Sequence, residues 1–287
     1  MRELGASANI REIDSFCLEP ACLTCDPSKL ADALYPAVLA AGTAIMSHYD
    51  ARTAMEEKGD GSPVSAADRD AEDIILAALE RLAPGVPVIA EEAASSGKVI
   101  DAQDTFFLVD PLDGTREFAA RRPEFTVNIA LISHGVPIFG MIYAPALSEL
   151  YWTTGNAAFK ALLPVDPPRM LHDLKTERLA TAATHPGPQT IVASRSHGSD
   201  DLEAWLQSIA VGTRVNIGSS LKFCLVAQGK ADLYPRFGPT MEWDTAAGHA
   251  IAVAAGGSVT RTDGSAFLYG KAAENYRNPG FIVWSKP

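Results

Sequence analysis

The sequence predicts a mixed α/β fold in which helices are layered on β-sheet. Three observations carry this prediction: two amphipathic helical patterns open the chain, a series of apolar runs and hairpin turns follows, and strand and helix patterns then alternate to the end. The chain has 287 residues, of which 47% are hydrophobic. It is therefore long enough for one large domain or two of ordinary size with a substantial core.

The two opening helices are predicted from the spacing of their apolar residues. Asp26–Pro27 supplies an N-cap and a first-turn proline, and apolar residues recur at helical spacing over residues 30–49. A polar loop over residues 56–64 separates this helix from the next. The second helix opens at Ser65 and ends at Pro84–Gly85.

Strand patterns fill the middle of the chain. Apolar runs at residues 88–90 and 106–109 each lead into acidic residues. Two hairpins are predicted over residues 126–143 and 151–160, because alternating apolar residues flank polar turns there. Several prolines in residues 164–190 indicate a boundary between two parts of the chain.

We therefore expect three parts. Residues 1–28 form an N-terminal extension, residues 29–163 form an α+β part that carries most of the acidic residues discussed below, and residues 164–287 form a C-terminal α/β part. The last part alternates strands with helices, and one of its helices opens at Asp244 and stops at Gly256–Gly257.

Charge and cysteine content limit the class of protein. The net charge of −11 argues against a nucleic-acid polymer or an anionic membrane as partner. No apolar run approaches about 20 residues, and the N-terminus lacks the layout of a secretory signal. Cys17, Cys22, Cys25 and Cys224 do not form a disulfide framework, although Cys22 and Cys25 have the spacing of half a zinc site. We expect a cytoplasmic protein with no transmembrane segment.

Acidic residues follow two of the predicted strands and open a helix. Glu91 follows the first strand, Asp110 and Asp113 follow the second, and Asp244 opens a helix. Carboxylates at strand ends gather at one edge of a sheet, where they repel each other unless a cation lies between them. Mg²⁺ and Ca²⁺ prefer oxygen ligands of this kind. The sequence therefore indicates a site for divalent cations.

The string from Asp110 to Thr115, DPLDGT, is the strongest of these signals. Gly114 and Thr115 add backbone amides and a hydroxyl, which suit phosphate. Haloacid-dehalogenase-type phosphatases carry two aspartates that lie two residues apart, on one side of an extended segment. Here Asp113 lies three residues after Asp110, and Pro111 supplies a turn. Joint metal coordination therefore fits better than a nucleophile and acid pair.

Each acid also has an ordinary structural explanation. Glu91 fits a solvated turn, and Asp110 before proline fits a turn initiator. Asp244 fits a helix cap, and Asp68 with Ser65 fits a capping box. Considered one by one, these residues do not decide between a structural and a functional role.

Taken together, the motifs resemble the Mg²⁺-dependent, lithium-sensitive phosphatases of the inositol monophosphatase superfamily. The similarity rests on Glu91–Glu92, on DPLDGT at 110–115 and on WDTAAGHA at 243–250. Further segments, from about residue 30 to the end, are similar to the 3′(2′),5′-bisphosphate nucleotidase branch. They are SPVSAAD (62–68), EFTVNIALI (124–132), SRSH (194–197), GSSLKFCLVAQGKADLYPRFGPT (218–240) and NPGF (278–281).

The resemblance implies a fold and an activity. The fold is an αβαβα sandwich. The activity is hydrolysis of the 3′-phosphate of 3′-phosphoadenosine 5′-phosphate to AMP and phosphate, with the sulfated precursor as a second substrate, in sulfur assimilation or nucleotide recycling. An inositol monophosphatase or another phosphatase of small phosphomonoesters is the alternative. A non-catalytic nucleotide-binding protein on this fold is a more remote one.

The resemblance also implies two or three Mg²⁺ ions per active site and assigns residues to roles. The implied metal ligands are Glu91, Asp110, Asp113, Asp244 and the backbone carbonyl of Leu112. Asp68 and Thr115 are the implied pair that activates water. The implied substrate contacts are Gly114, Thr115, Ser194, His197, Ser219, Lys222 and Arg236. The partner is a small molecule, the protein is a monomer or a homodimer, and peripheral contact with the inner face of the cell membrane is left open.

Three positions depart from the family pattern. Two of the implied substrate contacts could also be ordinary surface residues. Ser65 stands where the family has threonine, and Ala90 and Ala93 flank the glutamate pair, of which Glu91 is chosen as ligand by its register with the motif. Arg236 could grip a phosphate with two N–H groups or be an exposed loop residue, and His197 could be a ribose contact, a base or a surface residue.

Overall fold

The first helix shows how closely the structure follows the sequence pattern. In the computed structural model, which describes residues 26–51, 56–57, 63–64, 66–97, 102–195 and 199–286, helix α2 spans Pro27–Ala51. Asp26 Oδ1 accepts hydrogen bonds from the backbone N–H groups of Ser28 and Lys29, at 3.1 and 3.3 Å. The predicted N-cap is therefore confirmed.

Helix α2 would be long and apolar enough to cross a membrane by length and composition alone, which we did not expect from the sequence. Half of its apolar window is buried within the protein. Its buried stripe packs on α3 (Ala66–Leu82) and on the largest sheet, as expected for a core helix. The fully buried residues of α2 are Leu30, Ala31, Leu34, Tyr35, Val38, Ala41 and Ile45.

The largest sheet has seven strands in the order β3-β4-β5-β6-β7-β8-β9. Strand β3 is parallel to β4, and the other neighbours are antiparallel, so both predicted hairpins are confirmed. The strands are β3 (Val88–Ala90), β4 (Thr105–Asp113), β5 (Thr126–Ser133), β6 (Val136–Ala144), β7 (Glu149–Thr154), β8 (Ala157–Leu162) and β9 (Thr176–Arg178).

Strand β4 is apolar from Phe106 to Val109 because both of its faces are buried there. Phe107 and Val109 pack toward α2 and α3, whereas Phe106 and Leu108 pack toward the helices on the other face of the sheet. The unbroken run of apolar residues is typical of a strand that is covered on both sides. It also means that the chain reaches Asp110 while still inside the core.

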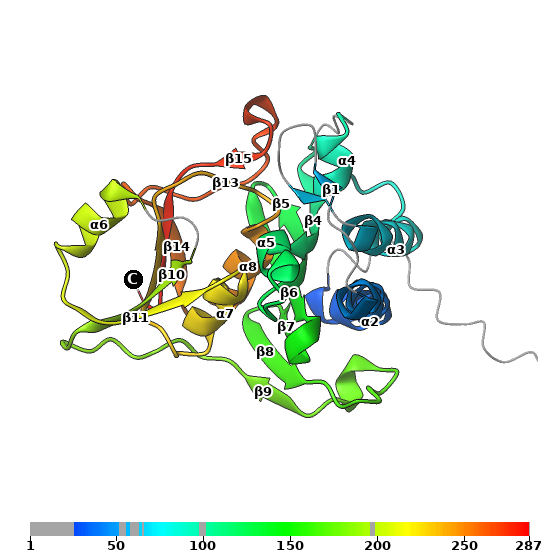
Figure 1. The fold of residues 1–287 in the computed structure, drawn as a ribbon, viewed down its shortest axis with the longest axis horizontal. Coiled ribbons are helices and arrows are strands. Elements are labelled where there is room, and N and C mark those ends of the chain that lie inside the picture. Colours follow the sequence, from blue (N-terminus) through cyan, green and yellow to red (C-terminus); the bar gives the residue numbers. More distant parts are fainter. Residues whose placement is uncertain are drawn as a thin grey trace, which may run out of the picture.

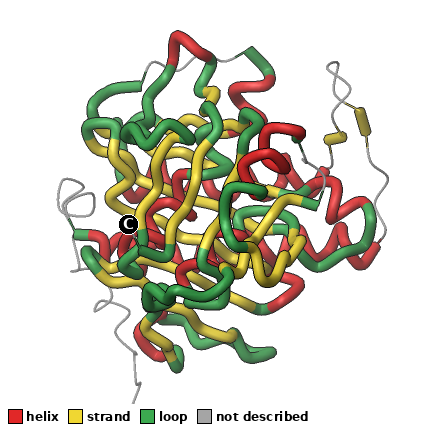
Figure 2. Tube along the Cα trace, turned by 90° about the vertical axis from the view of Figure 1, so that its left-hand side faces the viewer, coloured by secondary structure: helices red, strands yellow, loops and turns green. Residues whose placement is uncertain are grey.

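A second sheet has five strands in the order β11-β10-β12-β16-β14. Figure 2 views the molecule from the side of this sheet, whose strands lie next to one another. The strands are β10 (Gln189–Ser194), β11 (Val211–Ile217), β12 (Leu233–Arg236), β14 (Ser258–Arg261) and β16 (Phe281–Trp284).

The helices complete a stack of five layers (Figure 1). Helices α7 (Leu221–Ala227) and α8 (Ala246–Ala254) lie between the two sheets, and α2 and α3 cover the outer face of the larger sheet. Helix α6 (Asp200–Leu206) covers the outer face of the smaller sheet, on which Leu202 and Leu206 pack. The expected αβαβα sandwich is therefore confirmed.

Short elements connect these layers. The two-stranded ladders are β1 (Glu56–Glu57) with β2 (Pro63–Val64) and β13 (Thr240–Met241) with β15 (Arg277–Asn278). The short helices are α4 (Glu91–Ser95), α5 (Thr115–Ala119), η1 (Pro145–Leu147), η2 (Leu171–Asp173) and η3 (Ala272–Glu274). The division of the chain after residue 163 stays a prediction. Strand β9, which follows that position, still belongs to the seven-stranded sheet, and the core between the sheets contains residues from both halves of the chain.

Candidate active site

Two strand ends bring Glu91 and Asp110 together. Strand β3 runs parallel to β4 with Ala90 opposite Val109, so the next residue of each strand is acidic. Glu91 then begins α4, and Asp110 lies buried in β4. The ladder between β4 and β5 is irregular between Asp110 and Asp113, where the turn was predicted from the proline. Carboxylates from neighbouring strands therefore meet at one edge of the sheet.

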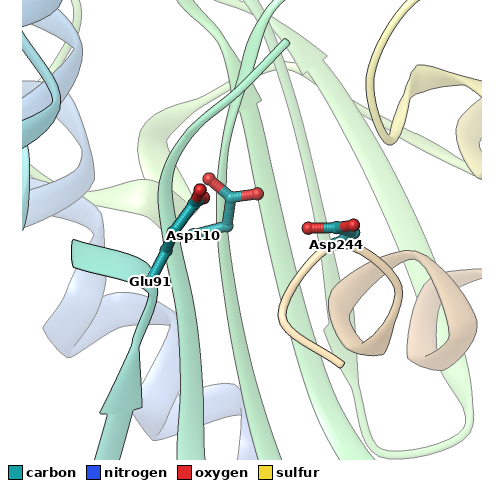
Figure 3. Close-up of side chains that lie close together, drawn as sticks. All are labelled: Glu91, Asp110 and Asp244. Carbon is teal, nitrogen blue, oxygen red and sulfur yellow. The ribbon is translucent and has the colours of Figure 1, made fainter. Parts of the chain in front are cut away.

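Asp244 reaches the same place from the opposite side of the site. It lies in the turn that precedes α8, and Figure 3 shows its side chain facing those of Glu91 and Asp110. One carboxylate oxygen from each of these three residues lies within 4.8 Å of the others. Three carboxylates at this separation can share a cation, and their all-oxygen donor set fits Mg²⁺ or Ca²⁺.

The electrostatics of the cluster also favour a cation. Burial and the charges of four neighbours, Glu91, Asp113, Asp244 and Asp68, hold the pKa of Asp110 well above its usual value. Burial and the charge of Asp113 raise the pKa of Asp244 to about 6, although its hydrogen bonds from Thr240 and Met241 act in the opposite direction. Without a positive charge between them, these groups oppose each other's ionisation.

Asp113 and Asp68 border the cluster without belonging to the group of three. Asp113 Oδ2 lies 2.9 Å from the hydroxyl of Ser220. Asp68 is buried on α3 and lies close enough to Asp110 for its charge to raise the pKa of that residue. The pairing of Asp68 with Thr115, the first residue of α5, stays a prediction. Ser65, which would complete a capping box with Asp68, lies outside the described residues.

Several side chains that hold the acidic residues were missed by the sequence analysis. The Ser220 hydroxyl, at the start of α7, lies 2.7 Å from the backbone carbonyl of Asp244 and accepts a hydrogen bond from Asn128 at 2.9 Å. Thr240 donates to the carboxylate of Asp244. Ser220 is also the neighbour of Asp113, so it links the two acidic segments. The sequence analysis assigned a role to the neighbouring Ser219 but none to Ser220.

Glu72 is another residue whose role the sequence did not reveal. Its buried carboxylate accepts hydrogen bonds from the backbone N–H groups of Glu92 and Ala93, at 2.9 and 3.0 Å. N–H groups in the first turn of a helix have no partner within the helix, so Glu72 caps α4, which begins at Glu91. A glutamate on α3 thus fixes the orientation of the helix start, and only the fold brings the two together.

A cavity of about 210 Å³ adjoins Asp113. Six of the seven predicted substrate contacts line it, and the seventh, His197, lies outside the described residues. The six are Gly114, Thr115, Ser194, Ser219, Lys222 and Arg236. The sequence analysis did not include three further lining residues, which are Arg116, Glu117 and Gly218.

Besides Arg116, the basic residues Lys222 and Arg236 bring positive charge to this cavity. Lys222 is buried, and its ammonium group donates to the carbonyl of Ser219 and lies 5.4 Å from the ring centre of Tyr234. Arg236 donates from Nη2 to Pro239 O at 2.9 Å, while its buried Nε has no hydrogen-bond partner among the described residues. A buried N–H donor without a partner is costly, so an anion beside Arg236 would be stabilised.

Two glycines keep the cavity open. Gly114 has a φ of +96°, and a Cβ atom there would lie 3.0 Å from Glu124 O. A Cβ atom on Gly218 would lie 2.5 Å from Cγ of Glu117. Any other residue at either position would strain the backbone or displace a wall of the cavity.

The chain is similar in sequence to known bacterial proteins. The 3′(2′),5′-bisphosphate nucleotidase CysQ of Salmonella typhimurium is 46% identical over 245 residues, which is 85% of this chain and 94% of that protein. The protein of the same name from Buchnera aphidicola is 38% identical over 258 residues, which is 89% of this chain and 93% of that protein.

Solved structures show the same fold. CysQ from Bacteroides thetaiotaomicron, described as a bacterial member of the inositol monophosphatase family, is 42% identical with a TM-score of 0.73, over 89% of this chain and 96% of that one. Inositol monophosphatase from Anabaena is 23% identical with a TM-score of 0.65, over 91% of each chain, and supports the fold alone. Residues 26–281 match the sequence pattern of the inositol monophosphatase family. The chain described here belongs to that family.

Proposed function

We propose that this protein is a 3′(2′),5′-bisphosphate nucleotidase that hydrolyses the 3′-phosphate of 3′-phosphoadenosine 5′-phosphate to AMP and phosphate. The observation that carries the proposal is a cluster of three carboxylates, Glu91, Asp110 and Asp244, beside a cavity that holds Lys222 and Arg236. The name of the CysQ relatives, 3′(2′),5′-bisphosphate nucleotidase, supports this class of substrate. The sulfated precursor stays a prediction as a second substrate. A cytoplasmic location and a monomeric or homodimeric state remain predictions.

The cofactor in this proposal is Mg²⁺, with two or three ions per site. Glu91, Asp110, Asp113, Asp244 and the carbonyl of Leu112 would hold them. When bound, such ions supply Lewis-acid stabilisation of the phosphoryl and leaving oxygens. The burial of Asp110 keeps this ligand in place, and the hydrogen bond from Leu112 N to its Oδ1, at 3.1 Å, orients the carboxylate.

The remaining chemistry is proposed for the buried Asp68 and for two residues of the cavity wall, Gly114 and Thr115. Asp68 accepts the proton of the attacking water through the hydroxyl of Thr115, which acts as the relay. The backbone N–H groups of Gly114 and Thr115 hold the phosphate that is cleaved. These roles agree with the burial of Asp68 and with the places of Gly114 and Thr115 on the cavity wall.

Lys222 and Arg236 are proposed to bind the second phosphate of the substrate. Both line the cavity, and no ion pair to either side chain occurs among the described residues. A substrate with one phosphate, held at Gly114 and Thr115, would leave these two cations without an anionic ligand in the cavity. A bisphosphate therefore fits better than inositol monophosphate, which is the alternative substrate.

A substrate panel tests the proposal. Phosphate release would be measured from 3′-phosphoadenosine 5′-phosphate, its sulfated form, inositol 1-phosphate and fructose 1,6-bisphosphate, each in Mg²⁺ and in chelator. We expect the adenosine bisphosphate to give the highest kcat/KM and the chelator to abolish turnover. A preference for inositol 1-phosphate would overturn the choice of substrate, and no turnover of any substrate would favour a nucleotide-binding protein.

A double variant tests the metal ligands. Asp110→Asn with Asp113→Asn should lose Mg²⁺ binding, measured by calorimetry, together with turnover. Asp104→Asn is the matched control, because Asp104 precedes the opposite end of β4 and its side chain is 85% exposed. Turnover that survives in the double variant would remove these two residues from the metal site.

A further inference from the structure

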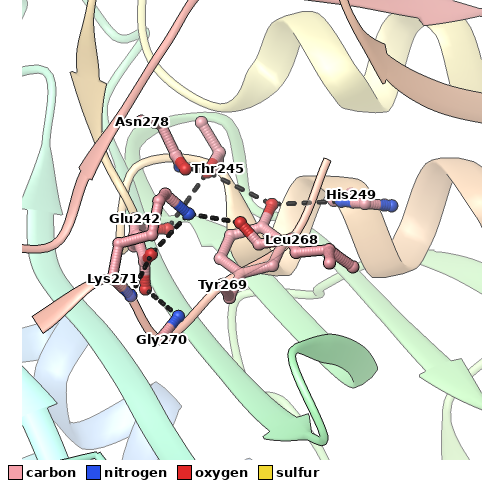
Figure 4. Close-up of polar contacts among 8 residues, drawn as sticks. All are labelled: Glu242, Thr245, His249, Leu268, Tyr269, Gly270, Lys271 and Asn278. Atoms are coloured by element: carbon pink, nitrogen blue, oxygen red, sulfur yellow. Dashed lines mark hydrogen bonds and ion pairs between the residues drawn. The ribbon is translucent and has the colours of Figure 1, made fainter. Parts of the chain in front are cut away.

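The turn that carries Asp244 is fastened to a distant segment of the chain. We call residues 267–278 the strap, and it lies across the turn formed by residues 240–245 (Figure 4). Strands β13 and β15 pair Thr240 with Asn278 and Met241 with Arg277, and the N–H group of Glu242 donates to the carbonyl of Tyr276 at 2.8 Å. Backbone pairing thus joins the turn to the strap on the N-terminal side of Asp244.

Glu242 adds a charged clamp to this pairing. Its side chain is fully buried, and its carboxylate accepts hydrogen bonds from the backbone N–H groups of Gly270 and Lys271 at 2.8 and 3.0 Å. It also forms an ion pair with Lys271 Nζ at 2.6 Å. All three contacts come from the strap. Separating the turn from the strap would leave the Glu242 carboxylate buried without its partners, which is strongly unfavourable. We therefore expect the turn and the strap to move as one unit.

Thr245 fastens the turn on the other side of Asp244. Its hydroxyl oxygen lies 2.9 Å from Nδ2 of Asn278 and 3.3 Å from the hydroxyl of Tyr269, and it donates to the carbonyl of Glu242 at 3.1 Å. The residues on both sides of Asp244 are therefore held by the strap, while Thr240 and Met241 hold its carboxylate.

We propose that Glu242 is a positioning residue, which sets the place of the Asp244 carboxylate relative to Glu91 and Asp110 by clamping the turn to the strap. Asp110 lies in the seven-stranded sheet and Glu91 directly follows its strand β3, whereas Asp244 belongs to a turn outside that sheet. The three carboxylates share a cation only while the turn keeps its distance from the sheet. This inference rests on the metal site proposed above.

The chain offers a matched control for the clamp. Glu149 and Lys160 form a second ion pair with the same distance of 2.6 Å, between neighbouring strands β7 and β8, and their side chains are largely buried. Neither residue belongs to the cavity or to the turn. Loss of this pair should lower stability as loss of the clamp does, but should leave the metal site in place.

The experiment compares Glu242→Gln with Glu149→Gln. Binding of Mn²⁺, used as the probe ion, would be measured by electron paramagnetic resonance on the full chain, and the melting temperature would be measured without metal. We expect Glu242→Gln to weaken Mn²⁺ binding by about 10- to 100-fold. Glu149→Gln should lower the melting temperature and leave the Mn²⁺ affinity unchanged.

Two outcomes would overturn the inference, and they differ from each other. A lower melting temperature with unchanged Mn²⁺ affinity in Glu242→Gln would give Glu242 a purely structural role, while the proposed metal site stands. Failure of the wild-type protein to bind Mn²⁺ would overturn the metal site as well.

If Glu242→Gln does not fold, Lys271→Met replaces it. This variant keeps both backbone hydrogen bonds to Glu242 and should show a smaller loss of Mn²⁺ affinity.

Discussion

The charged carboxylate of Asp110 destabilises the folded state of the metal-free protein. Because burial and four neighbouring carboxylates hold its pKa well above the usual value, its charge is unfavourable in the fold. Asp110→Asn should therefore raise the free energy of unfolding in chelator at pH 7, by about 1–3 kcal/mol. Urea denaturation measures this change. The same variant should lose Mg²⁺-dependent phosphate release.

The control for this prediction is the exposed Asp104 at the other end of the strand. Asp104→Asn should change the free energy of unfolding by less than about 0.5 kcal/mol and leave turnover intact. Destabilisation of the metal-free protein by Asp110→Asn would show that the aspartate is held by favourable contacts, and would contradict the electrostatic argument for a cation at this place.

Gly218 decides how much room the substrate has. A Cβ atom there would lie 2.5 Å from Cγ of Glu117, so Gly218→Ala must displace Glu117 or the glycine backbone, both of which line the cavity. We expect KM for 3′-phosphoadenosine 5′-phosphate to rise about 10-fold or more, with a smaller effect on kcat, because binding is disturbed before the reacting groups are. Steady-state kinetics of phosphate release measure both constants.

Gly238→Ala is the matched control, because a Cβ atom at Gly238 would meet no other atom within 4 Å. Its kinetic constants should stay within about twofold of the wild type. Equal effects of the two substitutions on KM would mean that the wall formed by Gly218 and Glu117 does not limit the substrate.

At the scale of single elements, helix α8 contains a buried titratable group that lies outside the proposed chemistry. Burial lowers the pKa of His249 to about 3, and its Nδ1 lies 3.1 Å from the hydroxyl of Tyr269. Tyr269 and Phe267 pack beside the ring. In the unfolded chain the imidazole of His249 binds a proton near pH 6.5, whereas in the folded protein it stays neutral down to about pH 3. The free energy of unfolding therefore falls as the pH falls from 6.5 toward 3.

The resulting prediction concerns the slope of stability against pH. His249 should lower the free energy of unfolding by about 1.4 kcal/mol for each pH unit between roughly pH 6 and pH 4. His249→Gln should flatten the curve in this window, whereas His134→Gln should not, because the His134 side chain is 75% exposed. Parallel curves for wild type and His249→Gln, measured by urea denaturation, would disprove the assignment.

The elements also show which parts of the fold follow from local sequence. The N-cap at Asp26 and the two hairpins depend on residues close in the chain, and all three were predicted. The apolar run of β4 identified the buried strand before Asp110. Strand β9 was missed, because Thr176–Arg178 is exposed and short and joins the sheet only through its pairing with β8.

For the whole molecule, long-range contacts separate what was predicted from what was not. The acidic residues were identified by motif, and the structure brings Glu91, Asp110 and Asp244 together. The residues that hold them come from other layers. Ser220, Glu72 and Glu242 find their partners 20 or more residues away. Residues so far apart in the chain form no recognisable local sequence pattern. Sequence patterns therefore predicted the layers of the fold and the acidic residues, but not the side chains that hold those acidic residues in place.

Metal removal should affect the stability of the entire molecule. A cation shared by Glu91, Asp110 and Asp244 would tie the seven-stranded sheet to the turn before α8, and it would bind the folded state only. Binding at 100 times the dissociation constant stabilises a folded protein by about 2.7 kcal/mol. Differential scanning calorimetry should therefore show a rise in melting temperature with Mg²⁺ and its reversal by chelator.

The origin of this shift can be tested with Asp244→Asn. This variant removes one carboxylate, so we expect its melting temperature to respond to Mg²⁺ no more than to a sodium salt at the same ionic strength. Asp104→Asn, with the cluster intact, should show the wild-type shift. If Asp244→Asn kept the full shift, the ions would act elsewhere on the acidic surface, because a protein with a net charge of −11 attracts divalent cations without a built site. The stability of the fold would then not depend on the cluster that defines the proposed active site.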